Sequence, residues 1–503
     1  MLFSSMIFLW LFLPFVLVVN LVLPIRLSNL FLLAMSFIFY AWGEQEYIWL
    51  LLLSLAVNYA GAMGMEAVRG SGHDAGTAGA DAGADGAAAM SDRQTTSGAS
   101  KQTLITPDKL LLVALVAVNL GFLGYFKYFD FLTGLVNKLA GGTVMEPKNL
   151  LLPVGISFYT FQMISYGADV YRGTIRAERN LLNLGLYMSF FPKMIQGPIE
   201  RYQGMGACIR NRHVTPELFA CGARRFIYGL GKKVILANQF GSVVDKVLAN
   251  PMDQISGGLG WYVGILYTLQ IYFDFSGYSD MAVGLGKMLG FELTENFNYP
   301  YLARTVGEFW RRWHISLGQF FRDYVYVPMG GSRVTSKFIL VRNLFVVWLL
   351  TGIWHGASWN FIMWGLGYFL LLTIEKLIML PRNDWGIISK SLYRCFTLLA
   401  VLLGWVLFRA DGMHSAFYYV KSMFGLSGNA FFNGNTVRYI TNSAVLLVLA
   451  VLFSTPVISN TLNYLEKRYR IRILIDLCYI VLFLLAVSSL VMGANNPFIY
   501  FNF

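Results

Sequence analysis

Residues 344–373 decide the fold class, and they read LFVVWLLTGIWHGASWNFIMWGLGYFLLLT. Within these 30 residues, His355 is the one readily ionisable side chain. So long an apolar run exceeds the roughly 20 residues that an α-helix needs to cross a bilayer. We therefore predict that this stretch lies in a membrane. His355 should face the protein interior or a cavity, because an imidazole loses its hydration in lipid.

The composition of the whole chain points the same way. Of the 503 residues, 56% are hydrophobic and only 13% are charged, whereas a soluble domain carries about 25% charged residues. The net charge is +12, but the basic residues form short runs between apolar stretches, which is typical of membrane proteins and argues against a nucleic-acid partner. The four cysteines show neither a CxxC pair nor a metal-ligand spacing with histidines, so we expect no bound metal.

Apolar segments near the length of a bilayer crossing recur along the chain. They cover residues 3–23, 27–42, 47–65, 110–132, 150–170, 181–199, 226–247, 261–291, 338–380 (long enough for two), 392–408, 437–458 and 473–491. We predict an all-α polytopic membrane protein with roughly 10 to 13 crossings, forming one domain over residues 1–503. Residues 70–100 are rich in Gly and Ala and lack Leu, Ile, Val and Phe, which predicts a flexible loop between helices.

Two basic segments predict the orientation of the chain in the membrane. Residues 201–233 and 304–342 each contain seven or more Lys and Arg against one or two acidic residues. Such segments usually lie on the cytoplasmic side, where they set topology and contact anionic headgroups. Attraction of a phosphate-bearing acyl carrier from the cytosol is a second use that charge alone leaves open.

His355 is the first candidate for chemistry. A neutral imidazole can take a proton from a hydroxyl group, and apolar surroundings favour that uncharged form. The neighbouring Gly352, Gly356, Ala357 and Ser358 are small, so a long substrate can approach closely. The residues alone leave two roles open, a catalytic or transport group and a hydrogen-bonded structural histidine.

His314 is the second candidate. It lies within residues 308–331, EFWRRWHISLGQFFRDYVYVPMGG. Aromatic and apolar residues recur there at helical spacing, opposite Arg311, Arg312 and Arg322, which predicts an interfacial or re-entrant helix with His314 at its centre. The pattern is equally compatible with a packing role and a catalytic role for His314.

Two acidic residues, Asp274 and Asp280, lie in an otherwise apolar segment. Carboxylates at membrane depth carry protons or pair with cations. We favour the structural interpretation, in which both anchor the neighbouring basic helix through salt bridges.

Six sequence blocks, in this order, resemble the bacterial alginate O-acetyltransferase type of the membrane-bound O-acyltransferase family. The blocks are GISFYTFQMISY, FPKMIQGPIERY, IYFDFSGYSDMAVG, NFNYPYLARTVGEFWRRWHISLGQFFRDYVYVPMGGSR, LTGIWHGASWNFIMWG and GWVLFR. The resemblance covers essentially the whole chain except the Gly/Ala-rich segment. It implies a ring of membrane helices, with re-entrant helices, around a central tunnel in which a cytoplasmic acyl donor meets an acceptor from the outer face.

The resemblance also implies roles for particular residues. His355 matches the catalytic histidine of the family and is the expected base, and His314 matches its second polar position and is expected to orient donor or acceptor. From charge and position we predict that Arg311 and Arg312 contact the donor, and Lys337 stays open as a further candidate. The expected donor substrate is acetyl-CoA, with no tightly bound cofactor.

The expected function is to pass acetyl groups across the inner membrane of a bacterium, so that an extracytoplasmic acetyltransferase partner can O-acetylate an exopolysaccharide. Relatives that transfer D-alanine to teichoic acid or acetyl groups to peptidoglycan share the histidine motif, so the acceptor polymer stays open. Two other classes also stay open. One is a transporter of lipid-linked sugars that uses Asp274, Asp280 and His355 as a proton or cation path, and the other is a scaffold for a polysaccharide synthase.

Overall fold

The computed structural model describes residues 1–74, 106–381, 385–469 and 471–492, and this part of the chain is mainly α-helical. Its one β-bridge, antiparallel, joins Phe297 to Trp313. The α-helices are α1 (Leu13–Val22), α2 (Ile25–Ala41), α3 (Ile48–Asp74), α4 (Pro107–Ala140), α5 (Ile156–Arg172), α6 (Leu181–Ser189), α7 (Phe191–Met194), α8 (Tyr202–Arg210), α9 (Pro216–Gly231), α10 (Asn238–Leu248), α11 (Gly257–Met288), α12 (Val306–Arg312), α13 (Ile315–Phe321), α14 (Lys337–His355), α15 (Trp359–Leu377), α16 (Ile387–Arg409), α17 (Met413–Met423), α18 (Gly434–Phe453), α19 (Val457–Tyr469) and α20 (Arg472–Val491). The short π-helical segments are η1 (Phe8–Phe12), η3 (Lys232–Ala237) and η6 (Arg322–Tyr326). The short 3₁₀ helices are η2 (Gln45–Tyr47), η4 (Met252–Gln254) and η5 (Pro300–Leu302).

The membrane character predicted from the sequence is confirmed. Among the described residues, six helices are long and apolar enough to cross a bilayer, and they are α3 (with η2), α4, α14, α16, α18 and α20. Shorter apolar helices cover Phe8–Val22 and Ile25–Ala41. The segment 338–380 contains two helices, α14 and α15, as predicted. The chain is therefore a multi-pass membrane protein.

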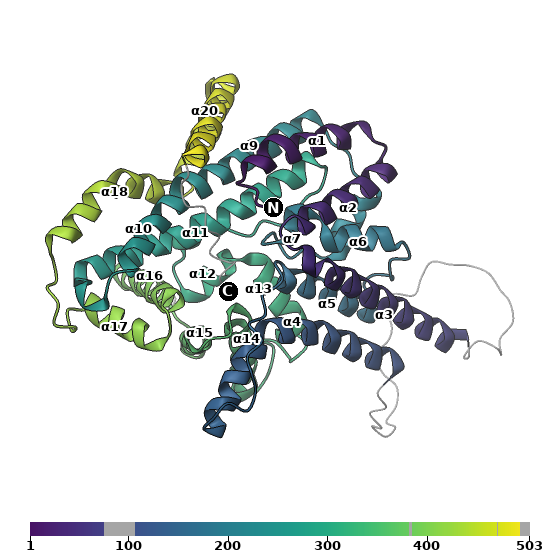
Figure 1. Ribbon diagram of the computed structural model, residues 1–503, viewed down its shortest axis with the longest axis horizontal. Helices are drawn as coiled ribbons and strands as arrows, with labels where there is room; N and C mark the ends of the chain where they lie inside the picture. The colour runs from purple at the N-terminus through teal and green to yellow at the C-terminus, as the bar shows by residue number, and fades with distance from the viewer. Residues whose placement is uncertain (75–105, 382–384, 470, 493–503) are drawn as a thin grey trace.

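Helix α11 runs through the middle of the molecule, with α9 and α10 beside it and α18 and α20 projecting at the periphery (Figure 1). Almost every side chain of α11 is buried, because other helices cover it on all sides. The approach of α9 is close enough to require glycine at the crossing. A Cβ atom on Gly229 would lie 2.5 Å from the Gly277 carbonyl oxygen.

The acidic residues of α11 pair with the basic residues that follow α9. Lys233 Nζ lies 2.5 Å from Asp274 Oδ1, and Lys232 Nζ lies 2.8 Å from Asp280 Oδ2. Arg225 contacts the same Asp280 carboxylate at 2.7 Å. Because a buried charge is stable only when paired, these contacts confirm the predicted structural role of both aspartates.

Two local predictions need correction. The single helix predicted over residues 181–199 is wrong, because α6 ends at Ser189 and only the short α7 follows. The freed backbone N–H of Phe191 donates to Ser36 Oγ at 3.1 Å, which satisfies it away from water. The loop predicted for residues 70–100 begins later, since α3 continues to Asp74, and the rest of that segment lies outside the described residues.

Candidate active site

His355 is the last residue of α14, and the extended backbone of Gly356 ends the helix directly after it. The side chain is buried within an aromatic cage. Its ring packs edge-on against Trp354, Trp364 and Phe408, with centroid separations of 4.7, 4.9 and 5.1 Å. The Nδ1 atom has no hydrogen-bond partner among the described residues. The ring is thus held by packing while a nitrogen atom stays available.

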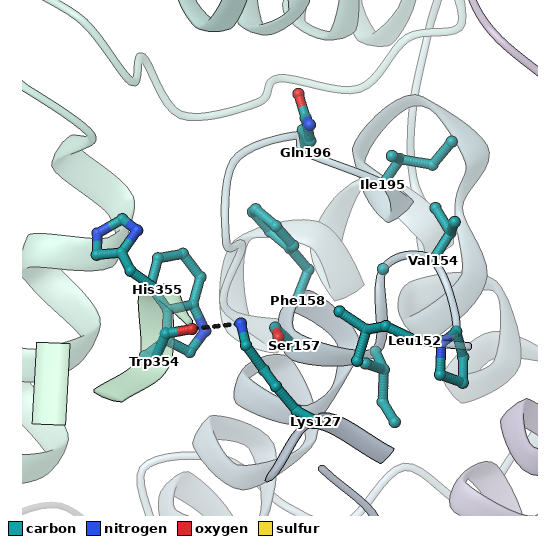
Figure 2. A pocket seen from close by; sticks show the side chains of 12 residues that line it. Lys127, Leu152, Val154, Ser157, Phe158, Ile195, Gln196, Trp354 and His355 are labelled. Carbon is teal, nitrogen blue, oxygen red and sulfur yellow. Dashed lines mark hydrogen bonds between the residues drawn. The ribbon is translucent and has the colours of Figure 1, made fainter. Parts of the chain in front are cut away.

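Two cavities reach His355. The smaller has a volume of about 50 Å³ and is lined by Lys127, residues 152–158, Ile195, Gln196, Trp354 and His355. Figure 2 shows His355 and Trp354 on one side of it, with Leu152, Val154 and Ile195 opposite. The larger has a volume of about 480 Å³ and is lined by Gly307, Trp310, Arg311, Trp313, His314, Ile315, Leu317, Gly318, Gln319, Phe321, Arg322, Tyr326, Leu344, Val347, Trp348, Thr351, His355, Leu372 and Lys376. His355 is the residue that lines both.

Helix α5 relates the two cavities to the basic segment. The first residues of α5 line the smaller cavity. At the other end, Arg172 Nη2 donates to the Asp323 carbonyl oxygen at 2.9 Å, within the basic segment predicted to face the cytoplasm. The 17 residues of α5 span about 25 Å at 1.5 Å per residue. The larger cavity extends from His314, whose ring packs against Phe158 in the first turn of α5, to Arg322, which precedes Asp323.

His314 does not lie within a continuous helix, so that prediction is wrong. It sits between α12 and α13 with a φ angle of 46°, in the left-handed region that non-glycine residues rarely adopt. Backbone hydrogen bonds to the 296–298 segment hold this turn, from Asn298 N to Arg312 O and from Ile315 N to Asn296 O, both at 3.0 Å. The tertiary fold thereby places His314 in the larger cavity with His355, which is 41 residues further along the chain.

Comparison with known proteins identifies the family of the chain. A family model described as the membrane-bound O-acyltransferase family matches residues 174–407. Two probable alginate O-acetylases are similar to the chain. That of Pseudomonas putida is 35% identical over 100% of both chains, and that of Azotobacter vinelandii is 39% identical over 84% of this chain and 78% of its own. The peptidoglycan O-acetyltransferase of Helicobacter pylori is 32% identical over 85% of this chain and 80% of its own.

The chain belongs to the membrane-bound O-acyltransferase family. It is therefore an enzyme of the acyltransferase class embedded in a membrane. The larger cavity of this O-acyltransferase contains no obvious metal site, since no group of three His, Cys, Asp or Glu side chains lies close together in the part of the chain that the structure describes.

The structure separates the two arginines predicted to contact the donor. Arg311 lines the larger cavity of this O-acyltransferase together with His314 and His355. Arg312 does not line it. Its guanidinium group donates to Glu308 Oε1 at 2.9 Å and to the Asn298 carbonyl oxygen at 3.1 Å, which is a structural arrangement.

Three further cationic residues lie at the cavities, and two of them, Lys127 and Lys376, were not predicted from the sequence. Arg322 and Lys376 line the larger cavity, and Lys127 lines the smaller one. Lys127 carries a usable sequence signal, because it is the only charged residue between Lys109 and Asp130 in an apolar segment. An ionisable residue at membrane depth is by default a functional candidate. Lys376 carries no such signal, since it lies at the end of its helix.

Lys127 and Tyr128 hold the end of helix α14. The Lys127 ammonium group donates to the Trp354 carbonyl oxygen, drawn as a dashed line in Figure 2, and the Tyr128 hydroxyl donates to the Ile353 carbonyl oxygen at 2.6 Å. The last carbonyl groups of a helix lack partners within that helix, and cations stabilise this negative end of the helix dipole. The pair therefore orients the turn that presents His355.

Replacing Lys127 with methionine should lower the acyl-transfer rate about tenfold, because displacing a reacting group by about 1 Å can cost up to about 100-fold in rate. Methionine keeps the length of the side chain but removes the hydrogen bond to Trp354. The rate is measured in membrane vesicles at matched protein abundance. Lys138→Met, on the exposed last turn of the same helix, is the control. A wild-type rate in Lys127→Met would show that the hydrogen bond from Lys127 to the Trp354 carbonyl oxygen does not position His355.

Proposed function

We propose that this O-acyltransferase takes an acetyl group from acetyl-CoA on the cytoplasmic side of a bacterial inner membrane and transfers it to a hydroxyl acceptor on the other side, for O-acetylation of an exopolysaccharide. The observation that carries the proposal is that His355 lines both cavities. A donor in the larger cavity and an acceptor in the smaller one meet at the same imidazole. The similar proteins are named for O-acetylation of alginate and peptidoglycan, which supports a glycan as the final acceptor.

The reaction needs one base and close alignment, since a thioester is already activated. The neutral imidazole of His355 removes the proton from the acceptor hydroxyl as its oxygen attacks the acetyl carbonyl carbon. The carbon–sulfur bond then breaks, and the imidazolium returns its proton to the departing thiolate. The product is an acetyl ester and free CoA thiol. Both reactants are held at one point, which removes most of the entropic cost of a bimolecular reaction.

The larger cavity suits a donor of this chemistry. Its charged lining residues, Arg311, Arg322 and Lys376, are all basic and match the phosphate groups of CoA. Apolar residues such as Leu344, Val347 and Trp348 line the same space and suit the less polar arm that carries the acetyl group. The donor would therefore enter with its phosphates near the basic residues and its thioester towards His355.

The partner is an extracytoplasmic acetyltransferase that receives the acetyl group and modifies the polymer. The smaller cavity is much smaller than the donor cavity, at about 50 Å³ against about 480 Å³. A slender hydroxyl-bearing group fits there better than a sugar ring, which favours a relay over direct transfer to the polymer.

Transfer from labelled acetyl-CoA tests the proposal. Inside-out vesicles that contain the full-length protein and [¹⁴C]acetyl-CoA should release CoA thiol and place label on a non-lipid acceptor, without any ion gradient. A transporter would instead need sealed vesicles and a gradient. Thiol release that is equal in vesicles without this protein would overturn the proposal.

Arg311→Glu should raise the KM for acetyl-CoA about tenfold, which corresponds to about 1.4 kcal/mol of lost attraction. The reason is that a carboxylate repels the donor's phosphates at the cavity. Arg333→Glu makes the same change of charge in the same basic segment, at an exposed residue that does not line the cavity. Equal KM values in both variants would place the donor elsewhere.

A further inference from the structure

We propose that Asn296 is a positioning residue that holds His314 in the tautomer with hydrogen on Nδ1, so that Nε2 accepts a hydrogen bond from an N–H or O–H group of the bound substrate. The inference rests on the proposed function, because it takes acetyl-CoA to bind in the larger cavity, which His314 lines. It follows from three contacts of the Asn296 side chain and from the surroundings of the His314 ring.

The orientation of the Asn296 amide follows from its neighbour Ser316. The backbone N–H of Ser316 lies 3.1 Å from Asn296 Oδ1. A backbone N–H can only donate, so the amide atom at this position must be oxygen rather than nitrogen. The Ser316 hydroxyl also donates to Oδ1 at 2.9 Å, while its own oxygen accepts from Ile199 N at 3.0 Å. The backbone N–H and the hydroxyl group of Ser316 therefore both donate to Asn296 Oδ1.

This orientation determines the His314 tautomer. His314 Nδ1 lies 3.2 Å from the same Oδ1 atom. Two acceptors cannot form a hydrogen bond with each other, so Nδ1 must carry the hydrogen. Burial lowers the pKa of His314 to about 3, and the ring is therefore neutral at physiological pH. A neutral imidazole carries one hydrogen, which leaves a lone pair on Nε2.

The Nε2 atom has no partner within the described part of the protein. His314 is 3% exposed, and its ring packs against Phe158, Trp354 and Phe275 at centroid separations of 6.2, 6.0 and 4.6 Å. The titratable groups that share its cavity are Arg311, Arg322, Tyr326, His355 and Lys376. Because buried polar atoms are normally hydrogen-bonded, we infer that a substrate group supplies the missing donor.

The orientation of the Asn296 side-chain amide does not maximise the stability of the folded protein. Asn296 Nδ2 is itself buried and lacks a partner among the described residues, which carries a free-energy cost. The left-handed backbone of His314 is a second strained feature at the same turn. Both features are accounted for if the turn serves to aim an acceptor nitrogen into the cavity. His314 then cannot donate to the thioester oxygen in its neutral form.

Nitrogen NMR tests the tautomer without reference to activity. The chain has five histidines, so ¹⁵N-histidine labelling of the full-length protein in nanodiscs gives few signals, and His314→Gln identifies those of His314. We expect a protonated Nδ1 and an unprotonated Nε2 for His314 at neutral pH. A protonated Nε2 in the wild-type protein would overturn the inference, whether or not the protein transfers acetyl groups from acetyl-CoA.

Two substitutions at Asn296 test the consequence for the reaction. Asn296→Leu removes the acceptor and should lower kcat/KM for acetyl-CoA at least about tenfold. Asn296→Asp keeps an acceptor and should restore the rate at high pH. Its carboxylate stabilises the imidazolium, which raises the pKa of His314, so the acid limb of the rate profile should move to higher pH. Asn298→Leu, an exposed position two residues along, should behave like wild type.

The kinetic parameters show which substrate supplies the N–H or O–H group that donates a hydrogen bond to His314 Nε2. A rise in KM for acetyl-CoA in Asn296→Leu indicates an N–H or O–H of the acyl donor, and a fall in kcat at saturating acetyl-CoA indicates the acceptor hydroxyl. Either result supports the inference when the NMR tautomer is lost in the same variant. A wild-type rate in Asn296→Leu, or the same rate and pH profile in the Leu and Asp variants, would reduce Asn296 to a structural residue.

Discussion

Replacing His355 with glutamine should remove nearly all acetyl groups from the cell-surface polysaccharide while polymer yield stays unchanged. Glutamine has similar size and polarity but cannot act as a base at neutral pH. General base catalysis contributes about 10²- to 10⁴-fold to a rate, so we expect a loss of at least about 100-fold. The measurement is NMR of the purified polymer from strains with matched membrane abundance of the protein.

His414→Gln serves as the control for His355→Gln. His414 is an exposed residue of α17 that lines neither cavity at His355. Acetylation in the control should equal that of the wild type. Unchanged acetylation in the His355 variant would exclude this histidine as the base.

Replacing Gly229 with leucine should lower the thermal stability of the folded protein and the amount of it that accumulates. A Cβ atom on Gly229 would lie 2.5 Å from the Gly277 carbonyl oxygen and 2.7 Å from the Met281 backbone nitrogen. These atoms belong to the buried backbone of α11, which cannot rotate away as a side chain can. Overpacking of a core usually costs about 1–3 kcal/mol, and a clash with backbone should reach the upper end of that range. Thermal unfolding of detergent-solubilised protein, followed by size-exclusion chromatography, measures the loss.

Gly134→Leu is the matched control for Gly229→Leu. Gly134 also lies within a helix, α4, but a Cβ atom there meets nothing within 4 Å. The same substitution should therefore leave the midpoint of thermal unfolding close to that of the wild type. Equal midpoints in both leucine variants would mean that α9 and α11 separate at little cost. In that case the ion pairs of Asp274 and Asp280 would not depend on close helix packing.

Sequence patterns predicted the membrane fold because lipid imposes a simple rule on composition. Long apolar runs have few alternatives to spanning helices, and α4, α14 and α16 lie close to their predicted ranges. Prediction failed at 181–199 and around His314, where helices are interrupted. Apolar periodicity continues through both breaks, so it carries no sign of them. At the first break, Pro192 in the first turn of α7 disfavours a continuous helix. At the second, backbone hydrogen bonds to the distant 296–298 segment hold the turn.

The residues of the candidate site were likewise only partly predictable from the sequence. His355 could be singled out as the one ionisable side chain in its apolar run. Asn296 could not, because an asparagine in a polar loop has no pattern that distinguishes it. Its role depends on three contacts across at least 18 positions of the chain. Arg311 and Arg312 are adjacent in sequence, yet only one lines the cavity.

The sequence by itself determined that this protein lies in a membrane, that it belongs to an acyltransferase family and that His355 is its leading candidate base. These properties reside in composition and in short motifs, which survive without knowledge of distant contacts. Only the tertiary structure decided that two cavities meet at His355, that His314 joins the larger one and that Lys127 holds the end of its helix. Those properties arise from packing between segments far apart in the chain, where the position of one side chain depends on backbone groups that no local pattern specifies.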